Sequence, residues 1–200
     1  MKKVVVFIFV ISVSLHSFAQ DESEEKFFKK ENVFTGGTLN VAFGNQVTNL
    51  GISPFFGYSL NKYFDVAAVI NFNYISERLD YPTGDKIRQK LYGPGAFIRV
   101  FPAKFLFAQA QYEYNILRNK YIPLGATGSA IEKYNYNANS LLVGGGISSG
   151  KDFPYQKSYY YISILWDVAK DKNSPYKDNL NRSVPIIRAG YNIALFQGKR

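Results

Sequence analysis

Apolar side chains alternate with small or polar ones along most of the chain after residue 32. In residues 64–74 one parity holds Phe64, Val66, Ala68, Ile70, Phe72 and Tyr74, and the other holds Asp65, Ala67, Val69, Asn71 and Asn73. A period of two is typical of β-strands, and no helical period persists along the chain. The pattern predicts eight strands, at residues 33–44, 48–61, 63–77, 88–101, 105–117, 138–150, 157–168 and 184–196.

The second face of these strands and the lengths of their connections indicate a membrane barrel. This face is rich in Gly, Ser, Asn and Gln, which suits the narrow interior of a small barrel whose apolar face meets lipid. A soluble sandwich would instead show water a face of Lys, Glu and Thr. Three connections are short, whereas residues 78–87, 118–137 and 169–183 are long and polar. We therefore expect an all-β, antiparallel, eight-stranded up-and-down transmembrane β-barrel.

The start of the chain has the pattern of a cleavable secretory signal peptide. Two lysines precede an apolar run at residues 4–15, and a small-x-small sequence ends at Ala19. The run is shorter than the ~20 residues that a transmembrane helix needs. The predicted parts are a signal peptide at residues 1–19, a charged periplasmic leader at 20–32 and an outer-membrane barrel domain at 33–200.

Aromatic residues make up 17% of the chain, and several lie on the apolar parity near strand ends. There their rings would reach the two membrane–water interfaces, where Tyr and Trp gather. One predicted girdle, near the short turns, contains Tyr58, Phe64 and Tyr160, and the other, near the long loops, contains Tyr74, Tyr92, Tyr114 and Trp166.

With these features the chain resembles the OmpA/OmpX-like family of small eight-stranded outer-membrane β-barrels. The resemblance spans Val33 to Phe196 and rests on hairpins such as GYSLNKYFDVAAVINFNY and GAFIRVFPAKFLFAQAQYEY. It implies the outer membrane of a Gram-negative-type bacterium, and short turns on the inner side would place both termini in the periplasm. It also implies a last-strand signal for the barrel-assembly machinery, formed by Arg188, Gly190, Ile193, Leu195 and Phe196.

Five charged residues fall on the inward parity of the predicted strands: Asp65, Arg99, Glu113, Asp167 and Arg188. Side chains fill the lumen of an eight-stranded barrel, so charges buried there must pair. We expect them to form a polar plug that rigidifies the barrel, and we expect Asp167 and Arg188 to meet. The alternative is a narrow pore that opens when these pairs break.

The residues available for chemistry argue against catalysis. The chain has no cysteine, and its single histidine, His16, lies in the predicted signal peptide. The enzymes known among outer-membrane barrels use histidine as a general base or proton shuttle, for which its pKa is suited. We therefore expect no enzyme activity, no catalytic residue and no cofactor.

Two segments look like ligand motifs but depart from them. Residues 145–151 match the start of a phosphate-binding loop, but Asp152 replaces the Ser or Thr that would hold magnesium. Residues 171–178 carry acids, as a calcium loop does, but lack the glycine and the final glutamate of an EF-hand. We expect neither a nucleotide site nor a metal site.

The formal net charge is +9, and the bases concentrate in the long loops and their edges. Nucleic-acid binding would need a basic stripe on an ordered face, so we expect no nucleic-acid partner. Loop lysines beside tyrosines could instead contact phosphates of surface lipid.

The sequence as a whole favours a non-enzymatic outer-membrane barrel with a side-chain-filled polar lumen and an envelope-structural or surface-interaction role. Its expected partners are outer-membrane lipid and the barrel-assembly machinery. Three alternatives stay open: a subunit of a larger envelope or secretion complex with an envelope protein partner, a narrow pore, and a barrel that binds an apolar ligand.

Overall fold

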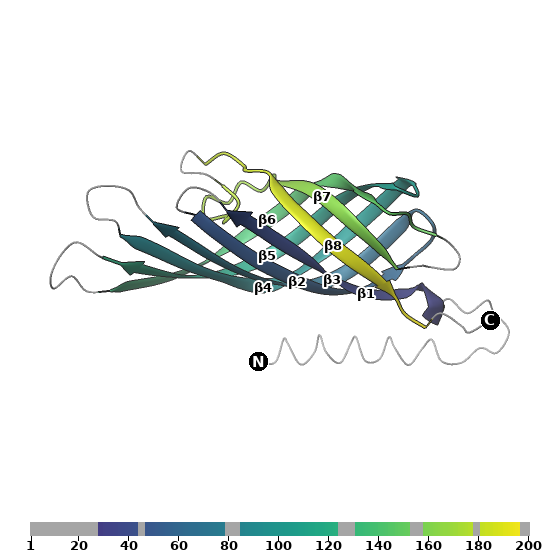
Figure 1. Ribbon diagram of the computed structural model, residues 1–200, viewed down its shortest axis with the longest axis horizontal. Helices are drawn as coiled ribbons and strands as arrows, with labels where there is room; N and C mark the ends of the chain where they lie inside the picture. Colours follow the sequence, from purple (N-terminus) through teal and green to yellow (C-terminus); the bar gives the residue numbers. More distant parts are fainter. Residues whose placement is uncertain are drawn as a thin grey trace, which may run out of the picture.

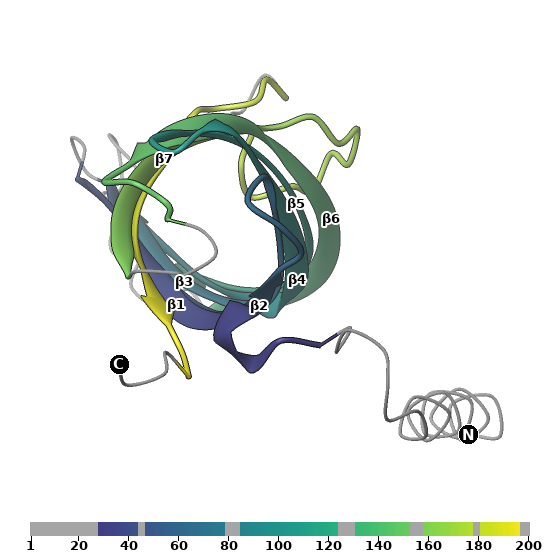
Figure 2. The same ribbon diagram turned by 90° about the vertical axis from the view of Figure 1, so that its right-hand side faces the viewer.

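Eight antiparallel strands close into one up-and-down barrel in the computed structural model, which describes residues 28–43, 47–78, 85–123, 131–152, 158–177 and 181–196. Strand β1 pairs with both β2 and β8, which closes the barrel (Figures 1 and 2). The predicted antiparallel, eight-stranded up-and-down barrel is therefore confirmed, whereas the predicted signal peptide lies outside the described residues. The strands are β1 (Val33–Phe43), β2 (Val47–Ser59), β3 (Phe64–Arg78), β4 (Lys86–Ala103), β5 (Leu106–Ile122), β6 (Glu132–Ser148), β7 (Tyr159–Asp167) and β8 (Ile186–Ala194).

The period-two pattern of the sequence becomes an alternation of exposure. In β3, Asp65 and Asn71 are buried in the lumen, while their neighbours Phe64 and Ile70 are exposed on the outer wall. A shift of one residue in strand register would turn the whole apolar face inward, so this pattern specifies the register strongly. Among the described residues, no helix has the length and apolar character needed to cross a membrane.

The lumen near the short turns is filled by aromatic rings rather than by small polar groups alone. Phe55 packs edge-on against Phe97 with ring centroids 5.4 Å apart, and Phe107 packs against Tyr161 at 5.7 Å. Gly190 leaves room for this cluster, because a Cβ at Gly190 would lie 2.4 Å from the Tyr161 ring. The buried cluster comprises Phe34, Phe55, Ala67, Val69, Phe97, Phe101, Phe107, Tyr159 and Tyr161.

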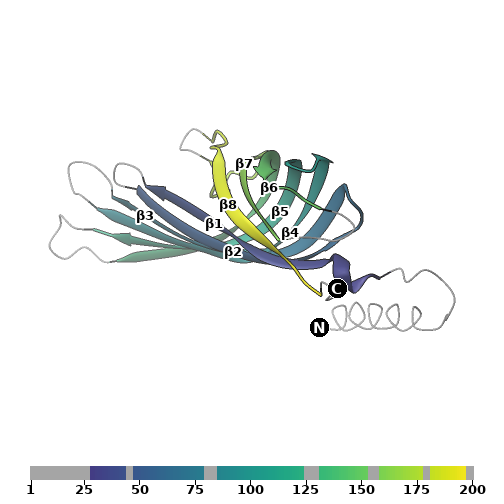
Figure 3. The same cartoon turned by 45° about the vertical axis from the view of Figure 1, so that its right-hand side comes forward.

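Strands β3 to β6 reach furthest at the end of the barrel away from the short turns (Figures 1 and 3), although β2 stays paired with β3 as far as Val47 and Glu77. Pairing of β5 with β6 reaches Tyr121 and Glu132, whereas pairing of β6 with β7 ends at Leu142 and Asp167. We call this extension the protruding sheet; it comprises residues 74–78, 86–92, 116–122 and 132–139.

The protruding sheet contains residues that the sequence analysis assigned to a loop. Residues 118–122 and 132–137 belong to β5 and β6, not to the predicted 118–137 connection. Hydrophobic alternation ends there because both faces of the sheet are polar, although the backbone ladder continues. On the inner face Gln89 donates to Asn119 at 2.9 Å and to Tyr136 at 3.3 Å, next to a buried apolar cluster of Leu91, Leu117 and Ala138.

Candidate functional site

The structure buries all five predicted lumen charges but divides them between two clusters. The lower cluster, near the short turns, contains Asp65 and Arg99, which lie opposite each other on β3 and β4. The Asp65 carboxylate accepts a hydrogen bond from Ser59 and pairs with Lys151 Nζ at 2.6 Å. Both charged side chains of this pair are almost wholly buried, so the pair is shielded from water and salt.

Lys151 is a lumen residue that the sequence analysis did not identify as one. It follows β6 in a short connection and extends back into the barrel, where it also donates to the carbonyl of Asn61 at 3.3 Å. Burial lowers the pKa of Lys151, and the adjacent Asp65 carboxylate opposes that shift. The one feature of the sequence that could have indicated this role is a lysine directly after a glycine-rich strand, in the segment that resembles a phosphate-binding loop.

Arg99 is held by aromatic rings and by an amide. Its guanidinium lies 4.0 Å from the centroid of the Tyr161 ring and 4.4 Å from that of Phe97. Its Nε donates to Gln109 at 2.7 Å. A cation over the face of a desolvated ring is stabilised by the ring quadrupole, so the aromatic cluster provides part of the countercharge.

A row of hydrogen bonds along the inner face of β5 links the two clusters. Gln109 Nε2 donates to Gln111 Oε1, and Gln111 Nε2 donates to Glu113 Oε1, each at 2.7 Å. Residues two apart share one face of a strand, so these side chains meet directly. Every donor in the row points from the Arg99 cation towards the Glu113 carboxylate. The sequence pattern predicts glutamine on the inner face, but no role was predicted for these two side chains.

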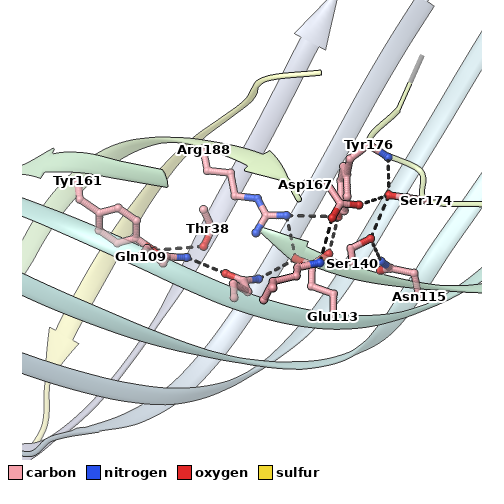
Figure 4. A network of polar contacts seen from close by, with 12 residues as sticks. Thr38, Gln109, Glu113, Asn115, Ser140, Tyr161, Asp167, Ser174, Tyr176 and Arg188 are labelled. Carbon is pink, nitrogen blue, oxygen red and sulfur yellow. Dashed lines mark hydrogen bonds and ion pairs between the residues drawn. The ribbon is translucent and has the colours of Figure 1, made fainter. Parts of the chain in front are cut away.

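The upper cluster centres on Glu113 (Figure 4). Its carboxylate accepts hydrogen bonds from Arg188 Nη2 at 3.0 Å and from the Tyr176 hydroxyl at 2.7 Å. Arg188 also donates to the Tyr176 hydroxyl at 3.3 Å. A buried carboxylate that is paired and fully hydrogen-bonded in this way avoids the cost of an isolated buried charge.

The predicted pair of Asp167 with Arg188 is wrong. The β7 residue opposite Arg188 is Ser163, and Asp167 lies further up the barrel. Asp167 instead accepts backbone N–H bonds from Leu141 at 3.0 Å and Ala169 at 2.9 Å, and a hydrogen bond from the Ser174 hydroxyl. Its carboxylate therefore fixes the start of the connection that follows β7.

That connection enters the mouth of the barrel. Tyr176 is buried with Leu142, Leu165 and Ile186, and Ser174 contacts Ser140 at 3.1 Å (Figure 4). Burial, together with the Glu113 carboxylate, raises the pKa of Tyr176 well above its ordinary value, so its hydroxyl stays a neutral donor.

Asp171, which the sequence analysis noted as one of several loop acids, binds backbone groups of the protein. It accepts hydrogen bonds from the N–H groups of Asn139 at 2.8 Å and Asn173 at 2.9 Å. These bonds lower the pKa of Asp171. Among the described residues, the structure holds no cluster of acidic residues of the kind that binds a metal ion.

The predicted girdle aromatics lie on the outer wall, but Tyr92 and Tyr114 fall inside β4 and β5 rather than near strand ends, because both strands are longer than predicted. Phe64, Tyr114, Tyr160 and Trp166 are exposed, and Tyr58, Tyr74 and Tyr92 are half-buried. Tyr58 stacks on Phe28 of the predicted leader with ring centroids 5.1 Å apart, so the end of this leader contacts the barrel.

The residues of the predicted assembly signal divide between the two faces of the barrel wall. Arg188 and Gly190 face the lumen, while Ile193 is exposed on the outer wall. Leu195 donates its backbone N–H to the carbonyl of Val33, and Phe196 is exposed. Recognition of this segment by an assembly machinery stays a prediction.

The chain matches no family model and no curated protein. Among solved structures, two crystal structures of Ail, the attachment invasion locus protein of Yersinia pestis, each match with a TM-score of 0.46 and 11% sequence identity. One is a complex with the heparin analogue sucrose octasulfate; the match covers 80% of this chain and 96% of that one. The other match covers 80% and 95%. The fold is that of a closed, antiparallel, eight-stranded up-and-down β-barrel, as its own strand pairing shows.

Proposed function

We propose that the protein is a non-enzymatic outer-membrane barrel that presents the protruding sheet at the cell surface as an interaction surface. The observation that carries this proposal is the extension of β3 to β6 beyond β7 and β8 (Figure 3). A barrel that only spanned the membrane would not need strands of this length, because roughly 9–11 tilted residues cross a bilayer. Strand β4 has 18 residues.

The outer wall supports the membrane location. Large apolar side chains are exposed around the whole barrel; among them, Ile52, Phe56, Ile70, Ile98, Ile162 and Ile187 are each at least 39% exposed. A soluble monomer rarely exposes continuous apolar surface of this extent. A bilayer around the barrel would cover this apolar surface, since lipid acyl chains are as apolar as these side chains. The alternative of a soluble barrel would leave the wall in water.

The strand ends support the orientation. Phe34 at the start of β1 pairs with Ala194 at the end of β8, so both ends of the barrel sequence lie on the side of the short turns. Short turns of outer-membrane barrels face the periplasm and longer loops face the exterior. In this orientation the protruding sheet lies outside the cell. Contact with outer-membrane lipid and insertion by the barrel-assembly machinery are part of the proposal.

The free edge of β6 supports an interaction role. Residues 132–138 of β6 have no strand partner on the side away from β5 among the described residues. Tyr134 is exposed there and stacks on Tyr136 with ring centroids 6.3 Å apart. An open strand edge next to aromatic rings can pair with an extended segment of another polypeptide.

Cysteine labelling tests the location, because the chain has no cysteine of its own. Tyr134→Cys should react with a membrane-impermeant maleimide in intact cells. Asn61→Cys, in a short turn, should react only after the outer membrane is permeabilised, and Ile70→Cys should stay unlabelled. Reaction of Asn61→Cys but not Tyr134→Cys in intact cells would refute the orientation.

A proline substitution tests the interaction role. The N–H groups of Asn139 and Leu141 point away from β5, so by alternation that of Asn137 does as well. Asn137→Pro should remove a donor from the free edge while keeping the ladder with β5, and Asn137→Ala is the control. Cells with Asn137→Pro should attach less well than control cells to reduced, carboxymethylated casein, which supplies extended chain. Equal attachment would rule out pairing through this edge.

A further inference from the structure

The outward face of the protruding sheet carries only positive charge. Seven cations lie on the outward parity of its strands: Arg78, Lys86, Arg88, Lys90, Arg118, Lys120 and Lys133. Its described residues include no acid on that parity. The nearby acids Glu77, Asp85 and Glu132 fall on the inward parity. These bases, which were predicted to lie in loops and at loop edges, therefore lie on an ordered face of the sheet.

The strand register places these cations directly opposite one another. Lys90 faces Arg118 across β4 and β5, and Lys120 faces Arg88 on one side and Lys133 on the other. Like charges directly opposite each other destabilise a sheet. An anion bound between them would convert this repulsion into attraction, with bidentate contacts available from the arginines.

These five cations line a hollow rather than a flat face. They surround a space of about 590 Å³, together with Tyr74, Asn119 and Asn135. We call the hollow formed by Arg88, Lys90, Arg118, Lys120 and Lys133 the basic hollow. Its positive charge suits an anionic group such as phosphate.

The level of the basic hollow points to lipid as the source of that phosphate. Its lower edge meets the upper aromatic girdle: Tyr74 pairs with Lys90, and Arg118 lies 5.2 Å from the centroid of the Tyr92 ring. Interfacial tyrosines lie at the level of lipid headgroups. Lys90 and Arg118 are therefore at the height of headgroup phosphates.

A second hollow below the first suits an acyl chain. It has a volume of about 540 Å³ and an apolar lining that includes Leu39, Ile52 and Phe72. Tyr74 and Lys90 line both hollows, so the two spaces adjoin. A ligand that is anionic at one end and apolar at the other matches this arrangement better than a soluble polyanion does.

We propose that the basic hollow binds the phosphate groups of an acylated, phosphorylated lipid of the outer leaflet, and that the adjoining apolar hollow holds one of its acyl chains. This site deepens the proposed function and rests on the orientation given there. Lys90 and Arg118 hold the phosphate nearest the bilayer, while Arg88, Lys120 and Lys133 extend the site outwards.

Binding of diphosphorylated lipid A to the mature protein in a non-ionic detergent tests the site, with bound lipid counted by native mass spectrometry. The double variant Lys90→Gln/Arg118→Gln should weaken binding by about tenfold or more. The matched control, Arg78→Gln/Lys86→Gln, removes the same charge from the same face but further from the girdle, and should change binding by less than about twofold. Fully dephosphorylated lipid A should bind no better than a neutral lipid.

Several results would overturn the proposal. Equal losses in the two double variants would indicate a diffuse field instead of a site, and equal binding of dephosphorylated lipid A would exclude phosphate recognition. Displacement of the lipid by an equal concentration of soluble polyphosphate would make the hollow a polyanion site. Heat-modifiable migration on gels checks that each variant folds. If a double variant does not fold, the single variant Lys133→Gln is measured in its place. Labelling of Asn61→Cys in intact cells would refute the orientation separately, since the binding assay contains no bilayer.

Discussion

Arg188 on β8 pairs with Glu113 on β5 across the lumen, at 3.0 Å between Nη2 and Oε1, and both side chains are buried. Each charge therefore depends on the other for compensation. Arg188→Gln should destabilise the barrel by about 3 kcal/mol, because the Glu113 carboxylate would stay buried with neutral donors only. Adding Glu113→Gln should recover part of this loss. Unfolding by urea in lipid vesicles measures both effects.

Asp167 provides the control for that cycle. Because its carboxylate binds Leu141, Ala169 and Ser174 instead of Arg188, Asp167→Asn and Arg188→Gln should be close to additive. Coupling as strong as that between Glu113 and Arg188 would contradict the observed pairing.

The two lysine–aspartate pairs near the short turns should differ in strength. Lys151→Met leaves the buried Asp65 carboxylate unpaired, and a loss of roughly 3–5 kcal/mol of stability is expected. Lys104→Ala breaks the pair with Asp152, in which the two side chains are 76% and 40% exposed, and should cost about 1 kcal/mol or less. The same urea titration compares the two variants, and similar losses would argue against a buried role for Lys151.

Substitutions on the outer and inner faces of β3 should destabilise the barrel to different extents. Ile70 is 52% exposed on the wall and the adjacent Asn71 is wholly buried. Ile70→Arg should cost about 2–4 kcal/mol if the residue lies at the bilayer midplane, and Asn71→Ala should cost less. Unfolding in vesicles of defined thickness measures the difference; the reverse order would place Ile70 outside the hydrocarbon.

Acid should loosen the connection between β7 and β8 where Asp171 binds it to β6. Backbone N–H bonds lower the pKa of Asp171 in the folded state, so the bond contributes stability above the unfolded-state pKa. That contribution is lost as the pH falls through the lower, folded-state pKa. Exchange of the Asn139 amide hydrogen, corrected for its intrinsic pH dependence, should therefore accelerate on acidification. Asp171→Asn should show faster exchange already at neutral pH and little further change.

The lumen should conduct few ions. Tyr176 and the charged groups around Glu113 fill the upper lumen, and the aromatic cluster fills the lower part. The wild-type protein in a planar bilayer should give small currents, and Tyr176→Ala should give more frequent brief openings. Large, steady wild-type currents would favour the pore alternative.

The sequence determined the number of strands and the face on which each residue lies. In β3 the alternation around Ile70 and Asn71 was sufficient, because the side-chain period of a strand is local and needs no partner. The girdle aromatics and the inward charges followed from the same parity. Where alternation stopped, at residues 118–137, the sequence no longer distinguished a polar sheet from a loop.

Tertiary structure alone decided which inward charges meet. Arg188 on β8 reaches across the lumen to Glu113 on β5, three strands away, rather than to Asp167 on the adjacent β7. Lys151 reaches Asp65 from a different connection altogether. Closure and stagger of the strands set the height of every side chain in the lumen and which walls face each other. These quantities depend on all eight strands at once, whereas parity depends only on neighbouring residues, so the pairing could not be predicted from alternation.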